Sequence, residues 1–199
     1  MKARARLTSV VLTVLCGALG LMSSTQTWLH VRLTGAAAHD LTVTGAAAIP
    51  VLAPLSLAVL ALGAALSIVG RALRYLFGAI ALGIGVVQLV LSARVGFGHP
   101  ISAVARTVTD ATGIAGDDAV SGLVDTITGT AWPLVAVAVW AVLCAVAVFV
   151  LATAAHWGSS GRKYRTDAAP SAAAGPVDAI DSWDDLSRGE DPTADRDPR

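Results

Sequence analysis

The fold is decided by the stretch Ala46–Ala93, which reads AAAIPVLAPLSLAVLALGAALSIVGRALRYLFGAIALGIGVVQLVLSA. It contains two apolar runs, Ala46–Gly70 and Tyr75–Ala93, joined by the short basic turn Gly70–Arg74. A helix of about 20 residues crosses a hydrocarbon layer of about 30 Å, so each run is long enough to span a membrane. Because cytoplasmic loops favour Lys and Arg, we expect the turn to lie on the inner side with its two arginines in water.

The composition is that of an integral membrane protein. The 199 residues are 55% hydrophobic and only 14% charged, with a mean hydropathy of +0.68. A soluble domain usually carries about 25% charged residues. The charges are also uneven, because residues 158–199 carry a net charge of −3 and residues 1–157 a net charge of +3. No basic patch is extensive enough to indicate nucleic acid as a partner.

Two further apolar runs lie near the ends of the chain, at Leu7–Leu29 and Trp132–Trp157. A signal peptide is the alternative for the first run, but no small-x-small cleavage site follows it and Trp28 fits an interfacial anchor. In the run Ala46–Gly70, the helix either begins near Pro50 or bends at Pro54. The sequence therefore predicts an all-α integral membrane protein with four spans, at 7–29, 46–70, 75–93 and 132–157.

The cationic residues predict the topology. Eight of them flank the predicted spans on one side: Lys2, Arg4, Arg6, Arg71, Arg74, Arg162, Lys163 and Arg165. The opposite side has Arg32, Arg94 and Arg106. By the positive-inside rule we expect a multi-pass protein of the plasma membrane with both termini in the cytoplasm and the lipid bilayer as its main surroundings.

Two segments are expected outside the bilayer. The runs Thr27–Thr34 and Leu41–Thr44 are rich in β-branched residues and flank a small-residue turn, so they predict a small extracytoplasmic hairpin. In the segment 94–131, two sets of apolar residues fall at helical spacing and predict one or two short amphipathic helices on the outer surface. The first set is Ile101, Val104 and Val108; the second is Leu123, Val124 and Ile127.

Polar and small residues inside the spans offer few functional signals. Gln88 is the strongly polar residue deep in a span, and an interhelical hydrogen bond is favoured there over a role in transport. Small residues recur four apart at Gly63/Ser67, Ala79/Gly83 and Ala81/Gly85. This spacing suits either a homodimer face, and so a homo-oligomer, or packing within one bundle, and the alanine-rich composition favours the latter.

The chain shows no convincing catalytic or metal site. The four histidines, His30, His39, His99 and His156, lie at or beyond the predicted membrane edges, whereas a haem would need histidines at depth. Asp110, Asp117, Asp118 and Asp125 match no calcium loop. Cys16 and Cys144 fall in apolar runs and are expected as buried free thiols. We therefore expect no cofactor, no metal and no enzyme activity.

The tail, residues 158–199, is expected to be disordered because it has little apolar surface to bury. Its exception is Ile180–Gly189, where Ile180, Trp183 and Leu186 share one face of a short helix that could form on a partner. The tail is thus the predicted docking segment for a cytoplasmic protein.

The tail motif also carries a family resemblance. Trp183-Asp184-Asp185-Leu186, followed by Gly189-Glu190-Asp191-Pro192-Thr193, resembles the C-terminal signature of the tryptophan-biosynthesis-associated membrane proteins of actinobacteria. The layout agrees: four spans, Thr42–Gly45 before the alanine-rich Pro54-Leu55 span, and Arg162-Lys163-Tyr164 after the last span.

The resemblance implies an association with tryptophan biosynthesis, and it carries over a motif rather than catalytic residues. We expect an accessory protein that docks a cytoplasmic partner through Trp183, Asp184, Leu186, Gly189, Asp191, Pro192 and Thr193. The alternative is a transport or permeability component for tryptophan or a related aromatic compound, and the lack of charged residues inside the spans counts against it. A membrane enzyme is the least favoured hypothesis.

Overall fold

The computed structural model describes residues 2–34 and 40–153, and this part of the chain is mostly helical. Seven helices and three strands follow one another: α1 Lys2–Thr25, β1 Thr27–Leu33, β2 Asp40–Thr44, α2 Gly45–Ala48, α3 Leu52–Leu66, α4 Arg71–Gly98, α5 Ile101–Thr112, α6 Asp117–Leu123, β3 Val124–Gly129 and α7 Trp132–Thr153. The predicted disordered tail and its docking motif lie outside the described residues.

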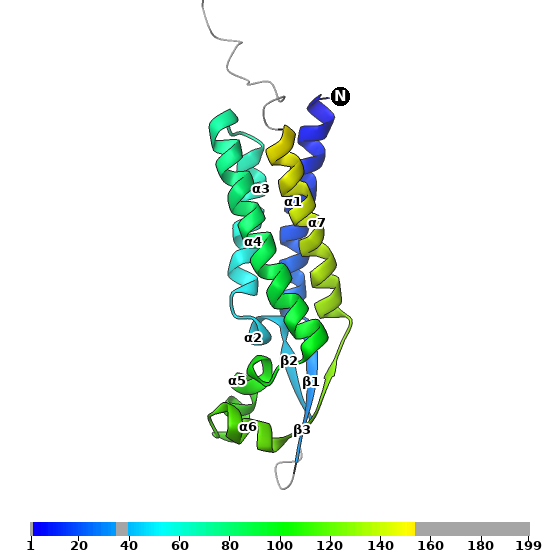
Figure 1. Ribbon diagram of the computed structural model, residues 1–199, viewed down its shortest axis with the longest axis vertical. Coiled ribbons are helices and arrows are strands. Elements are labelled where there is room, and N and C mark those ends of the chain that lie inside the picture. The colour runs from blue at the N-terminus through cyan, green and yellow to red at the C-terminus, as the bar shows by residue number, and fades with distance from the viewer. Residues whose placement is uncertain (1, 35–39, 154–199) are drawn as a thin grey trace, which may run out of the picture. The chain divides into compact units, whose positions relative to one another are not determined.

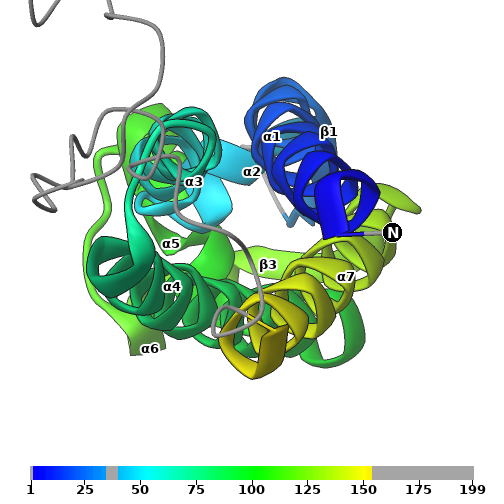
Figure 2. The ribbon, with the colours of Figure 1, turned by 90° about the horizontal axis from the view of Figure 1, so that it is seen from above.

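Helices α1, α3, α4 and α7 form a bundle in which each helix packs against two neighbours (Figures 1 and 2). Within the described ranges, three helices are long and apolar enough to cross a membrane, over Leu7–Thr25, Ala72–Gly98 and Trp132–Thr153. Helix α3 is apolar but has 15 residues. At 1.5 Å per residue it is about 22 Å long, shorter than a hydrocarbon layer of about 30 Å.

The predicted span 46–70 is wrong as one continuous helix. The chain forms the single turn α2, which the Thr44 hydroxyl caps by accepting a hydrogen bond from the Ala47 amide at 3.3 Å, and it then breaks at Pro50 before α3 begins at Leu52. Proline lacks an amide hydrogen and disfavours a helical residue before it. Pro54 falls in the first turn of α3, where an amide donor is not needed, so it does not bend the helix.

The other predicted boundaries also need correction. Helix α1 ends at Thr25 rather than at Leu29, because the next residues enter strand β1. Helix α4 runs from Arg71 to Gly98 rather than from 75 to 93, so the predicted turn is its first turn. Helix α4 ends where His99 adopts the left-handed conformation (φ 42°) ahead of Pro100. The fourth run begins at Trp132 as predicted, and its predicted end at residue 157 lies outside the described residues.

Two side chains expected in water or at the interface are buried in protein. Arg74 is 2% exposed, and its Nη2 donates a hydrogen bond to the Val69 carbonyl at 3.2 Å, so it does not extend into water as predicted. Trp28 is fully buried, and its indole Nε1 donates to the Ser23 carbonyl at 2.9 Å. The prediction of Trp28 as an interfacial anchor is therefore wrong, since the last turn of α1 satisfies its polar atom.

A three-stranded antiparallel sheet, ordered β2-β1-β3, lies at one end of the bundle (Figure 1). Strands β1 and β2 correspond to the predicted pair of strands, but the all-α prediction omitted β3. The helix predicted around Leu123, Val124 and Ile127 is wrong, because Val124 starts a strand and only the segment before it, α6, is helical. Strand β3 is rich in β-branched residues and pairs with the edge of β1 that β2 leaves unpaired.

The sheet and helices α2, α5 and α6 together form a cap, residues 27–34, 40–48 and 101–129. Helix α5 occurs where the spacing predicts it, and its Val104 and Val108 are fully buried. They belong to the same apolar core as Leu29, Val31 and Val43 of the sheet. The expectation that α5 rests on the membrane surface is therefore wrong, because the cap itself covers the apolar face of this helix.

Small residues allow the helices of the bundle to approach closely. A methyl group added at Gly63 would lie 2.7 Å from Cγ2 of Val14 on α1, and one added at Gly85 would lie 2.9 Å from the Cys144 sulfur on α7. Both glycines thus serve packing within the bundle, as favoured from the sequence. Gly83, in contrast, has no atom within 4 Å of an added methyl group and lies on the exposed face of α4.

Candidate functional site

The cap presents a polar sheet face, defined by the exposed side chains of His30, Arg32, Asp40, Thr42, Thr126 and Thr128. The register places them in two rows across the three strands. His30 of the central strand lies opposite Thr42 and Thr128, and Arg32 lies opposite Asp40 and Thr126. Because side chains alternate along a strand, the intervening apolar residues of β1 point into the core.

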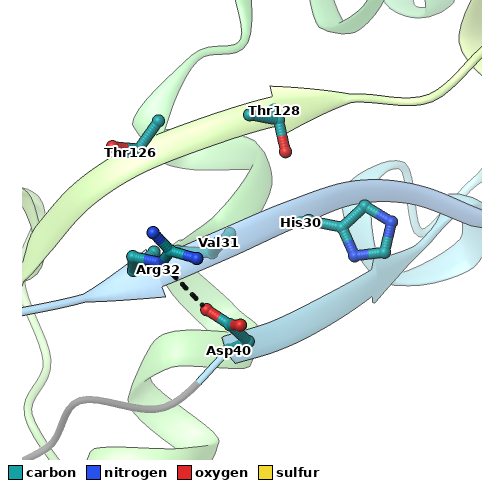
Figure 3. A pocket seen from close by; sticks show the side chains of 6 residues that line it. All are labelled: His30, Val31, Arg32, Asp40, Thr126 and Thr128. Atoms are coloured by element: carbon teal, nitrogen blue, oxygen red, sulfur yellow. Dashed lines mark hydrogen bonds and ion pairs between the residues drawn. The ribbon is translucent and has the colours of Figure 1, made fainter.

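A hollow of about 280 Å³ lies over part of the polar sheet face, next to His30, Arg32, Asp40 and the two threonines of β3 (Figure 3). Arg32 Nε donates to Asp40 Oδ1 at 3.2 Å, and the two side chains are 68% and 72% exposed. Such an exposed ion pair contributes at most about 1 kcal/mol. The hollow offers hydroxyl, imidazole and ionic groups to a polar ligand, and the residues lining it include no cysteine or serine nucleophile.

A second polar group, the bundle cluster, lies at the centre of the four helices and comprises Ser56, Gln88, Ser92 and Trp140, all fully buried. Gln88 Nε2 of α4 donates to the Leu52 carbonyl of α3 at 3.2 Å. The interhelical hydrogen bond predicted for Gln88 is therefore confirmed. Ser56 Oγ donates to the same carbonyl at 2.6 Å. The Leu52 carbonyl at the start of α3 therefore accepts hydrogen bonds from side chains of two helices, α3 and α4.

Helices α1 and α7 complete this cluster. A methyl group at Gly20 of α1 would lie 2.5 Å from the Trp140 ring and 2.7 Å from Ser56 Oγ, so the three residues are in close contact. Three polar atoms, Gln88 Oε1, Ser92 Oγ and Trp140 Nε1, are buried without a hydrogen-bond partner among the described residues. An unpaired buried polar group costs about 1–3 kcal/mol, which makes this cluster the least satisfied part of the described core.

The remaining sites predicted from the sequence are placed as follows. The docking motif from Trp183 to Thr193 lies outside the described residues. Both cysteines are free, Cys16 buried on α1 and Cys144 half-buried on α7. Across residues 2–34 and 40–153, no group of three His, Cys, Asp or Glu side chains is arranged to hold a metal ion. The four aspartates weighed as calcium ligands, Asp110, Asp117, Asp118 and Asp125, are exposed.

Several members of both polar groups were not predicted from the sequence. Thr126 and Thr128 went unrecognised because their strand was assigned to a helix, although the β-branched composition of Val-Asp-Thr-Ile-Thr was a usable strand signal. Ser56 and Trp140 are common residue types in apolar helices, and only the packing of four helices shows that they meet Gln88.

Comparison with known proteins gives one family. The family described as "Tryptophan-associated transmembrane protein" has a model that matches residues 10–193. The match includes α1 from residue 10 onward, the other three bundle helices, the cap and the tail motif. No curated protein and no solved structure is significantly similar to the chain.

Proposed function

The chain belongs to the family of tryptophan-associated transmembrane proteins, and on this premise we propose that it is a non-enzymatic accessory protein of tryptophan biosynthesis in the plasma membrane. The family description and the apolar helices support a multi-pass membrane protein linked to tryptophan. The accessory role is supported by the family description, which names an association with tryptophan rather than a class of enzyme.

The proposed topology has four spans, both termini in the cytoplasm and the cap outside. Helix α3 would cross with the help of the apolar residues on either side of it and of local thinning of the bilayer, which adapts to short spans at modest cost. The cationic residues around α1 and the α3–α4 turn support the orientation. Reporter fusions test it: a reporter at residue 115 should be active outside the cell, and one at residue 199 inside. The reverse pattern would reject this topology.

The observation that carries the accessory role is the pair Trp183 and Leu186, three residues apart in a tail of net charge −3. Such a pair forms one apolar face when the segment becomes helical, and helix-in-groove recognition uses this spacing. The family match extends to residue 193 and so includes this pair. We propose that this motif docks a cytoplasmic protein partner, with an enzyme of tryptophan biosynthesis as the leading candidate.

The test is an affinity pull-down of the full chain from gently solubilised membranes. A Trp183→Ala, Leu186→Ala variant should lose a specific partner, while the matched control Ser182→Ala, Ser187→Ala should retain it. Both double variants alter the same short segment, but only the first removes its apolar face. Equal recovery of all proteins by the three chains would refute the docking role.

The second candidate function is transport or permeability for tryptophan or a related aromatic compound. The specific observation in its favour is the bundle cluster, whose unpaired polar atoms face the centre of the four helices. The close contact of Gly20 with Trp140 counts against it, because little space remains there. Labelled tryptophan uptake and efflux in a deletion strain test this candidate, and unchanged rates would reject it.

A further inference from the structure

A pocket of about 230 Å³ lies where the link between α2 and α3, the end of α4 and the start of α5 meet. Its walls are mainly apolar and include Ile49, Val51, Leu91, Val95 and Ala103. The one charged residue among the residues that line it is Arg94. This pocket is separate from both the polar sheet face and the bundle cluster.

Arg94 is exposed and forms no hydrogen bond or ion pair with the described residues. The lining contains no acidic side chain that could neutralise it. Neighbouring apolar walls lower the local polarity and strengthen the attraction of a cation for an anion. A guanidinium binds phosphate through a planar fork of N–H donors, so this pocket suits a phosphate that is attached to an apolar group.

The start of α5 adds to the positive character of the pocket. Helix α5 has 12 residues, no acidic residue in its first turn and no side-chain cap at Pro100, and Ser102 of its first turn lines the pocket. The Ala103 amide donates to the Pro100 carbonyl at 3.0 Å, but the amides before it in the first turn have no acceptor within the helix, and the helix dipole there favours an anion. Arg94 and this helix end therefore favour the same kind of ligand.

The proposed topology places the pocket at the depth of lipid headgroups. Arg94 is four residues from the end of the apolar span Ala72–Gly98. A methyl group at Gly96 would lie 3.2 Å from Pro133, which follows Trp132 at the start of α7, so these two helix ends lie at one level. Tryptophan and arginine at such a level are typical of the membrane–water interface.

The face of α4 below Arg94 is suited to an acyl chain. Val87 and Val90 precede Arg94 by seven and four residues, which places all three on one face of the helix. These two valines are 48% and 44% exposed, so in the proposed topology they would face lipid. A phospholipid whose phosphate binds Arg94 can therefore place an acyl chain along this face of α4. A free inorganic anion has no apolar part to contact these valines.

We propose that this pocket is a binding site for one anionic phospholipid, with its phosphate at Arg94 and the start of α5 and one acyl chain along Val87 and Val90. The lipid would fill the junction between the bundle and α5. This site does not depend on which partner the tail binds, and its failure would leave the accessory role untouched.

The test uses the purified full chain in mild detergent, titrated with phosphatidylglycerol or with phosphatidylcholine of the same acyl chains and followed by native mass spectrometry. We expect one phosphatidylglycerol to be held more tightly than phosphatidylcholine. Arg94→Gln should weaken phosphatidylglycerol binding roughly fivefold, the ratio that corresponds to about 1 kcal/mol per cation near anionic headgroups. The matched control is Arg106→Gln, which removes an exposed arginine of α5 outside the pocket.

A second variant guards against a folding artefact. Ser102→Glu places a carboxylate in the first turn of α5, where it stabilises the helix but repels an anion from the pocket. It should weaken phosphatidylglycerol binding as Arg94→Gln does. Equal binding by the wild type and Arg94→Gln, or an equal loss in Arg106→Gln, would overturn the proposal. Displacement of the lipid by millimolar inorganic phosphate or tryptophan would also overturn it, because the pocket would then take a soluble anion.

Discussion

Replacing Gln88 by Leu should change the stability of the bundle only modestly, from a loss of about 1 kcal/mol to a gain of about 2 kcal/mol, although Gln88 is the most polar residue deep in an apolar helix. Its amide makes one hydrogen bond, from Nε2 to the Leu52 carbonyl, and its Oε1 is buried without a partner among the described residues. Leucine has a similar volume and brings no polar atom.

The magnitude follows from three terms. An interhelical hydrogen bond in a membrane contributes about 0.6 kcal/mol on average, and its loss is the first term. Removing a buried unpaired acceptor gains about 1–3 kcal/mol, and a near-isosteric change of shape usually costs less than about 1.5 kcal/mol. The Leu52 carbonyl keeps the Ser56 hydroxyl at 2.6 Å and does not become unpaired. The sum lies between about 1 kcal/mol of destabilisation and about 2 kcal/mol of stabilisation.

The assay is reversible unfolding of the full chain in mixed micelles by added SDS, followed by far-UV circular dichroism so that Trp140 does not dominate the signal. Ser92→Ala is the matched control, because it removes a second unpaired atom one helical turn further along the same face. Destabilisation by Gln88→Leu of more than about 2 kcal/mol would refute the reasoning, since the two unfavourable terms, the lost hydrogen bond and the change of shape, together reach only about 2 kcal/mol. Gln88 Oε1 would then have a partner such as a bound water or substrate, and the transport candidate would gain support.

Three further predictions use the same assay. Trp28→Phe should destabilise the protein by about 1–2 kcal/mol, because the indole hydrogen bond to the Ser23 carbonyl is lost in a fully buried position; an unchanged midpoint would contradict this. Gly20→Leu should cost at least about 1–3 kcal/mol by overpacking against the Trp140 ring, whereas Gly83→Leu should be nearly neutral, and equal effects would be inconsistent with the packing. Arg32→Ala should change stability by less than about 1 kcal/mol because its ion pair is largely exposed, and a larger loss would show that the pair is shielded from water.

The helical part of the fold was predictable because its signal is local. Long apolar runs need no partner in the sequence to be recognised, and the spacing of Val104 and Val108 is enough to indicate a buried helical face. Strand β3 was not predictable in the same way. Leu123, Val124 and Ile127 fit a helical face as well as a strand, and the choice is made by the free edge of β1, about a hundred residues earlier in the chain.

The candidate site residues were likewise predictable only where their signal is local in the sequence. Gln88 was recognised because it is an isolated amide in an apolar run, and its hydrogen bond to α3 is the one expected. Trp28 was assigned to the interface because tryptophan beside an apolar run usually lies there. Its true position depends on Gly45, which comes from the next segment and leaves room for the indole: a methyl group there would lie 2.7 Å from Nε1. Such space cannot be read from the residues next to Trp28.

The cap and the bundle share one apolar core, and this has consequences for how the polar sheet face can act. The same core contains Leu29 and Val43 of the sheet together with Leu52, Val95 and Trp140 of three bundle helices. A single residue separates the end of α1 from β1, and the Trp28 indole is bonded to the last turn of α1. A partner that tilts β1 would therefore have to move α1 or break this hydrogen bond. The polar sheet face is thus coupled to the first bundle helix through this shared core and this hydrogen bond, and the two cannot move independently.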